Sequence, residues 1–146
     1  MFLFQKKVLF AARKTSPRGS FGGTPTQTRV GGAITSYDIV DINEGAGFDQ
    51  QTGKFRAPEG GTYFFTFSAR TGEVKSYTSV RVNKDGSPHH YIYDGNAADT
   101  YNNINGSWMT SLSKGEEIYL SITRGKLWAS STNPVIFTGN LLKLDE

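Results

Sequence analysis

Residues 61–70 carry the pattern that most limits what this chain can fold into. Four apolar residues alternate there with a mostly polar set, and they are Tyr63, Phe65, Phe67 and Ala69. Successive side chains of a β-strand point to opposite faces, so this alternation predicts a strand that buries one face in a core. The opposite face is predicted to carry Phe64, Thr66, Ser68 and Arg70.

The composition supports a fold built from strands. The chain has 146 residues, 17 glycines and 13% aromatic residues, and it has no long apolar run at helical spacing. Aromatic residues favour strands and glycines permit tight turns, so we predict an all-β fold. The length is that of one domain, enough to bury about two-thirds of the unfolded surface. The absence of cysteine excludes disulfides and thiolate metal sites.

Further strands are expected at intervals along the chain, separated by turn signals. Their predicted ranges are 8–14, 30–34, 37–42, 54–57, 78–83, 89–93, 105–112, 117–123 and 135–144. Segments predicted to be loops occupy 15–28, 72–77, 94–104 and 124–133. If the strands from residue 61 onward alternate in direction, the last three loops gather at one end, away from both termini. Long loops on a rigid sheet are where binding tends to reside.

Eight spaced residues form a pattern that includes the strand at 61–70. They are Tyr37, Asn43, Phe48, Phe55, Gly61, Tyr63, Phe65 and Phe67. Their order and spacing resemble the signature of the C1q domain family, which takes its name from the globular head of complement component C1q. Residues 8–13 and 137–142 also resemble the first and last strands of that family. Two positions depart from its pattern, since Tyr37 replaces a phenylalanine and Asn140 replaces an aromatic residue.

The resemblance implies a ten-stranded jelly-roll β-sandwich of the C1q/TNF-like type, assembled as a compact homotrimer and secreted from the cell. We expect residues 1–7 to form an N-terminal arm and residues 8–146 to form the C1q-like globular domain. The apolar residues 1–4 are followed at once by Gln5, Lys6 and Lys7, which does not fit a secretory leader. If the protein is secreted, its leader lies outside this sequence. A collagen-like Gly-X-Y repeat is also missing from it.

Charge and motifs favour a binding function. The formal charge of +3 suits anionic partners but falls short of a nucleic-acid-binding composition, and no segment is suited to membrane insertion. No catalytic motif is present, and the adjacent His89 and His90 are expected to point to opposite faces of a strand.

Together with the resemblance, these features lead us to expect a secreted, non-enzymatic recognition module. It would bind glycans or other anionic extracellular surfaces in an innate-immune, lectin-like role. The alternative is a protein–protein ligand or adaptor, a C1q/TNF-like trimer that binds a receptor.

The candidate ligand-binding residues are Tyr101, Arg124, Lys126 and Trp128, all in the predicted loops. Arg124 and Lys126 flank a glycine and can converge on a carboxylate or sulfate, while an aromatic ring stacks against a sugar. The alternative for Trp128 is packing at the edge of the domain. Trp108 fits either the core or a subunit contact.

Two further sites follow from short patterns. Some members of the family hold calcium near the trimer axis, at positions that match Asp94, Gly95 and Asn102. Only Asp94 keeps a charge there, so Asp94 and Asn102 are a weak calcium candidate and we expect no other cofactor. The run Asn105-Gly106-Ser107 matches the N-glycosylation pattern, with Asn105 as the acceptor.

Overall fold

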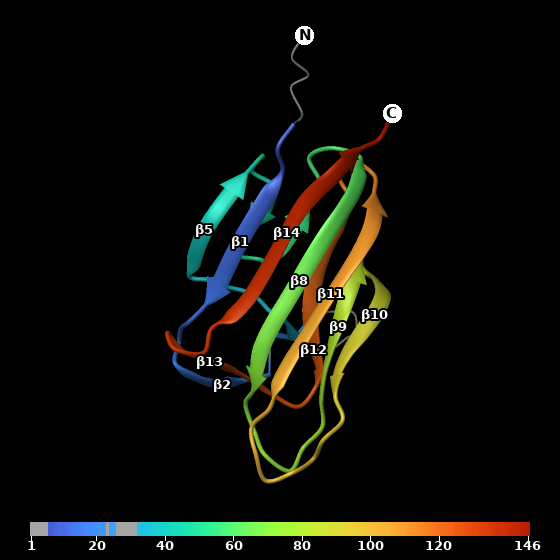
Figure 1. Ribbon diagram of the computed structural model, residues 1–146. Coiled ribbons are helices and arrows are strands. Elements are labelled where there is room, and N and C mark those ends of the chain that lie inside the picture. The colour runs from blue at the N-terminus through green and yellow to red at the C-terminus, as the bar shows by residue number, and fades with distance from the viewer. Residues whose placement is uncertain (1–5, 23, 26–31) are drawn as a thin grey trace.

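The computed structural model describes residues 6–22, 24–25 and 32–146, which form two antiparallel β-sheets packed face to face (Figure 1). The first sheet contains β1 (Leu9–Lys14), β2 (Gly19–Phe21), β5 (Ile39–Glu44), β8 (Gly61–Thr71), β11 (Asn103–Leu112), β13 (Leu127–Ala129) and β14 (Val135–Leu144). The second sheet contains β3 (Thr24–Pro25), β4 (Gly32–Ala33), β6 (Phe48–Asp49), β7 (Lys54–Arg56), β9 (Thr78–Lys84), β10 (Ser87–Asp94) and β12 (Glu117–Arg124).

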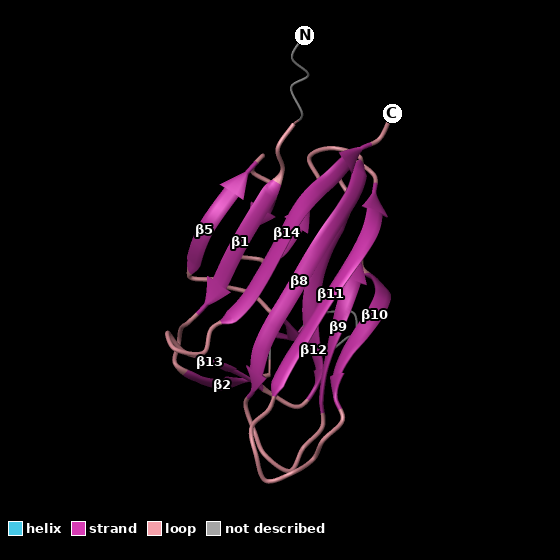
Figure 2. Cartoon of the chain, in the orientation of Figure 1, coloured by secondary structure: helices cyan, strands magenta, loops and turns pink. Residues whose placement is uncertain are grey.

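The prediction of an all-β fold is confirmed, because the described residues form strands, turns and loops without a helix (Figure 2). The same residues accordingly include no helix that could cross a membrane. The described residues form fourteen strands where ten were expected, and six of these strands, β2, β3, β4, β6, β7 and β13, are only two or three residues long. Parts of the predicted arm, of the loop at 15–28 and of the strand at 30–34 lie outside the described residues.

Two segments expected to be loops contain paired strands. β2 lies within 15–28 and β13 lies within 124–133, and they pair with each other through Leu127↔Phe21 and Ala129↔Gly19. β13 also pairs with the end of β8, through Trp128↔Arg70. Their glycine- and serine-rich composition indicates a loop, but pairing beside a long strand satisfies their backbone N–H and C=O groups.

β8 is the central strand of the first sheet, hydrogen-bonded to both β14 and β11. Its predicted inward face is confirmed, since Tyr63 and Phe65 are 0% exposed and Phe67 is 1% exposed. The intervening side chains are only half-buried on the outer face. The expected strand therefore forms, with one face in the core.

The C1q-like signature residues build the aromatic core and its turns. Phe48 stacks on Phe10 with ring centroids 4.6 Å apart, and Phe65 packs against Phe55 at 5.7 Å. The Asn43 side chain donates to the carbonyl of Phe48 at 2.9 Å and so closes the turn between β5 and β6. A Cβ at Gly61 would lie 2.3 Å from the Lys143 carbonyl oxygen, which explains why this strand starts with glycine.

Trp108, which the sequence allows either in the core or at a subunit contact, lies in the core. Its ring stacks on Phe65 at 5.5 Å, and the residue is 8% exposed. β11 thus places Trp108 between the sheets in this chain.

The termini and the long loops lie at opposite ends of the sandwich. Figure 1 shows the C-terminus and the start of β1 at one end, and the connections β8–β9 and β10–β11 at the other. We call this second end, with segments 72–77, 95–102 and 125–133, the loop end. The expected separation of the late loops from the termini is therefore present.

Candidate functional site

Backbone hydrogen bonds join the three segments of the loop end. Lys75 N–H donates to the Ala98 carbonyl at 2.8 Å, which ties the first segment to the second. Gly72 N–H donates to the Lys126 carbonyl at 2.6 Å, which ties the first to the third. Alternation of the strands thus brings together residues that are far apart in the sequence.

The most distinctive feature of the loop end is a stack of alternating aromatic rings and guanidinium groups. Arg70 is the penultimate residue of β8 and lies on its outer face. Its guanidinium carbon is 4.5 Å from the Tyr101 ring centroid and 4.6 Å from that of Trp128. Arg18 also lies over the Trp128 ring, at 5.5 Å. We call Tyr101, Arg70, Trp128 and Arg18 the arginine–aromatic stack.

The guanidinium groups of Arg70 and Arg18 in this stack are candidates for binding an anion. Attraction between a cation and an aromatic face holds each guanidinium over a ring. A guanidinium has five N–H donors, which can bind an anion. The Nε of Arg70 is buried and has no hydrogen-bond partner among the described residues. Neither Arg70 nor Arg18 forms an ion pair with a described residue, whereas Lys75 pairs with Asp99 at 3.4 Å. The two guanidinium groups therefore have no carboxylate partner among the described residues and could pair with a sulfate or carboxylate.

Arg124 occupies a neighbouring groove instead of joining this stack. Its guanidinium lies 4.9 Å from the Tyr77 ring centroid. The groove has a volume of about 270 Å³ and is lined by Tyr77, Ser79, Tyr93, Asp94, Gly95 and Arg124. We call it the tyrosine groove, since Tyr93 is 69% exposed and stacks on Tyr91 at 5.9 Å.

The four predicted ligand-binding residues therefore separate into two places. Tyr101 and Trp128 come together around Arg70, as candidates for stacking, while Arg124 lies in the tyrosine groove. Lys126 is exposed and contributes its backbone carbonyl to Gly72. Sequence reasoning missed Arg70 and Arg18, because Arg70 belongs to the outward set of β8 and its ring partners come from distant segments.

The calcium candidates Asp94 and Asn102 lie next to each other in space and are hydrogen-bonded within the loop. Asn102 Nδ2 donates to Asp94 Oδ2 at 3.0 Å, and the Asn96 N–H donates to Asp94 Oδ1 at 3.2 Å. Both carboxylate oxygens of Asp94 thus accept hydrogen bonds within the loop, whereas calcium requires six to eight oxygen ligands. No group of three or more acidic, histidine or cysteine side chains in the described ranges is arranged to hold a metal.

The expectation for the histidines is wrong. His89 Nδ1 and His90 Nδ1 are 2.7 Å apart and share a hydrogen bond, although the residues are adjacent in β10. A register shift in the pairing with β9, between Pro88 and His90, breaks the alternation of side chains. Burial lowers the pKa of both imidazoles, and His90 also lies against the Trp108 ring at 5.1 Å.

The predicted glycosylation acceptor lies away from the loop-end contacts described above. Asn105 is an exposed residue of β11, and its backbone pairs with Ser68 of β8. Its outward position makes the side chain accessible. Glycosylation of Asn105 stays a prediction.

Known structures identify the fold as a jelly-roll of the C1q and TNF type. The globular domain of zebrafish complement 1qA superposes with a TM-score of 0.72 at 17% identity, covering 94% of this chain and 99% of that one. Murine APRIL superposes with a TM-score of 0.70 at 17% identity, covering 94% of this chain and 100% of that one. This architecture agrees with the two sheets described above.

Sequence comparison then assigns the family. The C1q domain matches residues 22–142, so the chain belongs to the C1q domain family. Complement C1q tumor necrosis factor-related protein 3 of Mus musculus and of Homo sapiens are each 30% identical over 106 residues, or 73% of this chain and 43% of theirs. Caprin-2 of Danio rerio is 28% identical over 145 residues, or 98% of this chain and 15% of its own length.

The chain thus spans less than half the length of these relatives. Domains of the family are typically modules that bind a ligand or a receptor, and its members act in recognition or signalling.

Proposed function

We propose that this protein is an extracellular, non-enzymatic recognition module that binds acidic glycans at its loop end. The observation that carries the proposal is Arg70, held between the Tyr101 and Trp128 rings without a carboxylate partner among the described residues. An arginine fixed in this way presents N–H donors in the geometry that sulfate and carboxylate groups accept. An innate-immune, lectin-like role would follow if the glycans belong to microbial surfaces.

The flanking side chains suit a sugar that carries such a group. Tyr101 is 52% exposed, so part of its ring is available to the apolar face of a sugar. Arg18 adds a second guanidinium beyond Trp128, which allows a ligand with two anionic groups to bind both. A single site of this kind is open to solvent, and repeated sites would raise the apparent affinity for a surface with repeated ligands.

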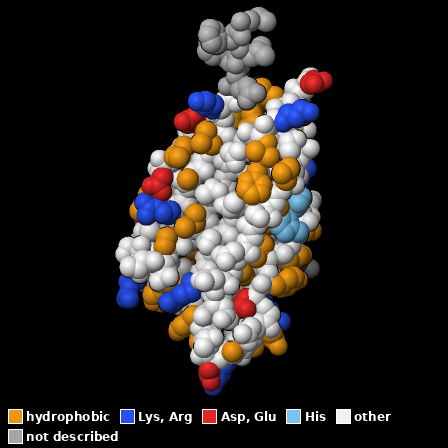
Figure 3. All heavy atoms as spheres, viewed as in Figure 1, with side chains coloured by type: hydrophobic (Ala, Val, Ile, Leu, Met, Phe, Trp, Pro, Cys, Tyr) orange, Lys and Arg blue, Asp and Glu red, His pale blue; other side chains and the backbone are white. Residues whose placement is uncertain are grey.

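Assembly as a homotrimer would provide that repetition. The outer face of the first sheet carries exposed apolar residues, including Met109 at 58%, Leu142 at 48% and Ile42 at 42%. Figure 3 shows this face as largely uncharged, with most Lys, Arg, Asp and Glu side chains toward its rim. An apolar face of this kind is typical of surfaces that become buried in symmetric oligomers.

Light scattering tests the assembly. We expect a particle of about three times the chain mass of 16.0 kDa at micromolar concentration. The variant Met109→Lys should shift the particle toward the monomer, because it would bury a charge at each contact. A wild-type protein that remains at the monomer mass would contradict the proposed trimer.

A second function, binding of a receptor protein, is favoured by the tyrosine groove. Tyr77, Tyr91 and Tyr93 are 44%, 42% and 69% exposed, and Arg124 lies among them. Tyrosine and arginine are enriched among the residues that dominate protein–protein binding energy. In this alternative the chain is a protein ligand or adaptor of the C1q/TNF-like type.

An array of sulfated, sialylated and neutral glycans separates the two functions. We expect the wild type to bind acidic glycans, Arg70→Gln to lose this binding, and Tyr93→Ala to retain it. Arg56→Gln is the matched control, since it removes the same charge far from the loop end. Arg56 lies in β7, which pairs with the start of β12, whereas Arg124 is at the end of β12.

Equal binding of acidic and neutral glycans, or unchanged binding by Arg70→Gln, would overturn the glycan proposal. Retention of a cell-surface protein by Arg70→Gln but not by Tyr93→Ala would support the receptor alternative.

A further inference from the structure

A lysine occupies a core-facing position of β1, where the alternation of the strand would otherwise place an apolar residue. Phe10, Ala12 and Lys14 share that face and are 2%, 0% and 7% exposed. Lysine is almost never buried to this extent without a charged partner. The position therefore calls for an explanation other than packing.

The ammonium of Lys14 is held by neutral oxygens only. It donates to the carbonyl of Thr35 at 3.0 Å and to that of Ser36 at 3.2 Å, and it lies 5.3 Å from the Phe21 ring centroid. An ammonium has three donors, so one N–H remains without an acceptor among the described residues. Burial lowers the pKa of this lysine, and the charge of Asp38 opposes that effect.

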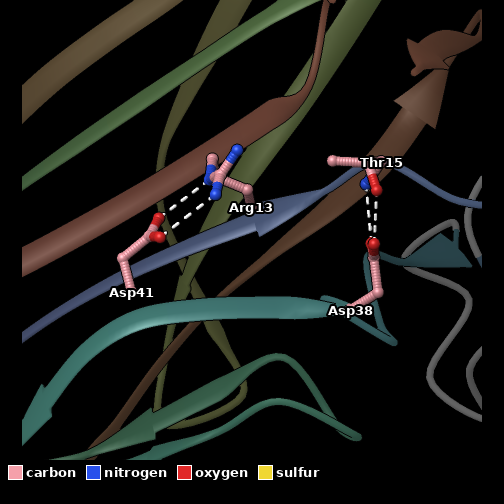
Figure 4. A network of polar contacts seen from close by, with 4 residues as sticks. All are labelled: Arg13, Thr15, Asp38 and Asp41. Atoms are coloured by element: carbon pink, nitrogen blue, oxygen red, sulfur yellow. Dashed lines mark hydrogen bonds and ion pairs between the residues drawn. The ribbon is translucent and has the colours of Figure 1, made fainter. Parts of the chain in front are cut away.

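The nearby carboxylate is already bound elsewhere. Asp38 accepts hydrogen bonds from the Thr15 hydroxyl and from the Thr15 N–H at 2.6 Å. Figure 4 shows Asp38 directed at Thr15, while Arg13 is paired with Asp41. No ion pair to Lys14 forms within the described ranges. A buried cation without a counter-ion is costly, and an incoming anion would offset that cost.

Lys14 lines a cavity of about 290 Å³ between β1, β2 and residues 33–36. Arg18 lies at the same cavity and is exposed, and the apolar part of the lining includes Pro17, Phe21 and Ala33. Hydroxyl groups come from Ser20 and Ser36. The volume is near the lower limit of small-molecule sites, which are mostly apolar with a few fixed polar groups.

We propose that this cavity, which we call the Lys14 pocket, binds a small monocarboxylate with a ring-shaped body. The carboxylate would accept hydrogen bonds from the remaining N–H of Lys14 and from an N–H of Arg18, and the ring would lie against Phe21 and Pro17. Two cations with Asp38 close by leave about one net positive charge, which matches a monoanion better than a phosphate dianion. The site is separate from the arginine–aromatic stack, with which it shares only Arg18.

NMR titration of the whole protein with benzoate and with glucuronate tests the proposal, using benzamide and glucose as uncharged counterparts. We expect at least one of the acids to shift the amide signals of residues 19–21 and 33–36, and neither neutral compound to do so. Tighter binding of benzoate would indicate a free organic acid as the natural ligand, and tighter binding of glucuronate an acidic sugar.

Three variants locate the binding. For the bound acid we expect an affinity loss of about tenfold or more for Lys14→Met and of a few fold for Arg18→Gln. Arg13→Gln is the matched control, because its side chain lies on the other face of β1 and should leave the affinity unchanged. Arg70→Gln should also retain binding of the acid, so the outcome is independent of glycan binding at the stack.

The exposed Arg18→Gln variant and the neutral compounds keep the test decisive if Lys14→Met does not fold. The proposal is overturned if neither acid binds, if the neutral compounds bind equally well, or if a folded Lys14→Met or Arg18→Gln binds as the wild type does. If the role of Lys14 is exclusively structural, neither acid binds.

Discussion

The core and the loop end both rely on aromatic side chains, but with different partners. In the core, rings contact rings, as in the stack of Phe10 on Phe48 at 4.6 Å and the edge contact of Phe10 with Phe137 at 4.9 Å. At the loop end, rings contact guanidinium groups, as in Arg70 with Tyr101 and Arg124 with Tyr77. The partner of the ring distinguishes the region that holds the fold together from the region that we propose binds ligands.

The physical reason lies in burial. Phe65 and Phe137 are 0% exposed, so nearly all their apolar surface contributes to folding. Tyr101 and Tyr77 are 52% and 44% exposed, so much of their surface remains available to a ligand. Side chains at the loop end therefore contribute less to stability and can be changed with less risk to the fold.

The largest effect is expected for Phe65→Ala in the core. Removing a fully buried ring should lower the free energy of unfolding by about 3–5 kcal/mol. Chemical denaturation with urea measures this loss, and Tyr101→Ala serves as the loop-end comparison. A loss below about 1 kcal/mol, within the range of surface substitutions, would place Phe65 outside the cooperative core.

A smaller effect is expected for Trp128→Ala at the loop end. The half-buried ring contacts Arg70 and Arg18, so its removal should cost about 1–3 kcal/mol through lost packing and cation–π contacts. The same urea experiment measures it. A loss as large as that of Phe65→Ala would assign Trp128 to the core and remove the proposed difference between the two regions.

The smallest effect is expected for calcium. Asp94 already accepts hydrogen bonds from Asn102 and Asn96, so chelation of calcium should shift the melting temperature by less than about 1 °C. Thermal melts in calcium and in chelator provide the measurement. A rise of several degrees in calcium would show that a metal stabilises the loop end.

The contrast also explains what could be predicted from the sequence. The alternation of β8 depends on local periodicity, so the sequence alone predicts which face of this strand is buried. Phe48 and Phe55 are placed in the core by the resemblance of their spacing to the C1q signature, and both are buried. The loops that carry Tyr101 and Trp128 are predicted to lie at one end because the strands alternate in direction, and both rings lie beside Arg70. Strand alternation is therefore sufficient to predict the buried face of β8 and the end of the sandwich where the late loops lie.

Other features depend on contacts that local patterns do not encode. The alternation of β8 predicts only that Arg70 points outward. Its contacts with the Tyr101 and Trp128 rings come from segments distant in the sequence. The pairing of β2 with β13 joins two glycine-containing segments from opposite ends of the chain. The bulge at His89 depends on the register with β9, which alternation alone does not specify.

Calorimetric titration of the wild type and of Arg70→Gln with a defined sulfated oligosaccharide, at low and high salt, tests the central claim most directly. The account predicts that Arg70→Gln binds about tenfold more weakly at low salt and depends less on salt, because one charge contact is lost. Equal affinity and equal salt dependence of the two proteins would contradict recognition through the arginine–aromatic stack.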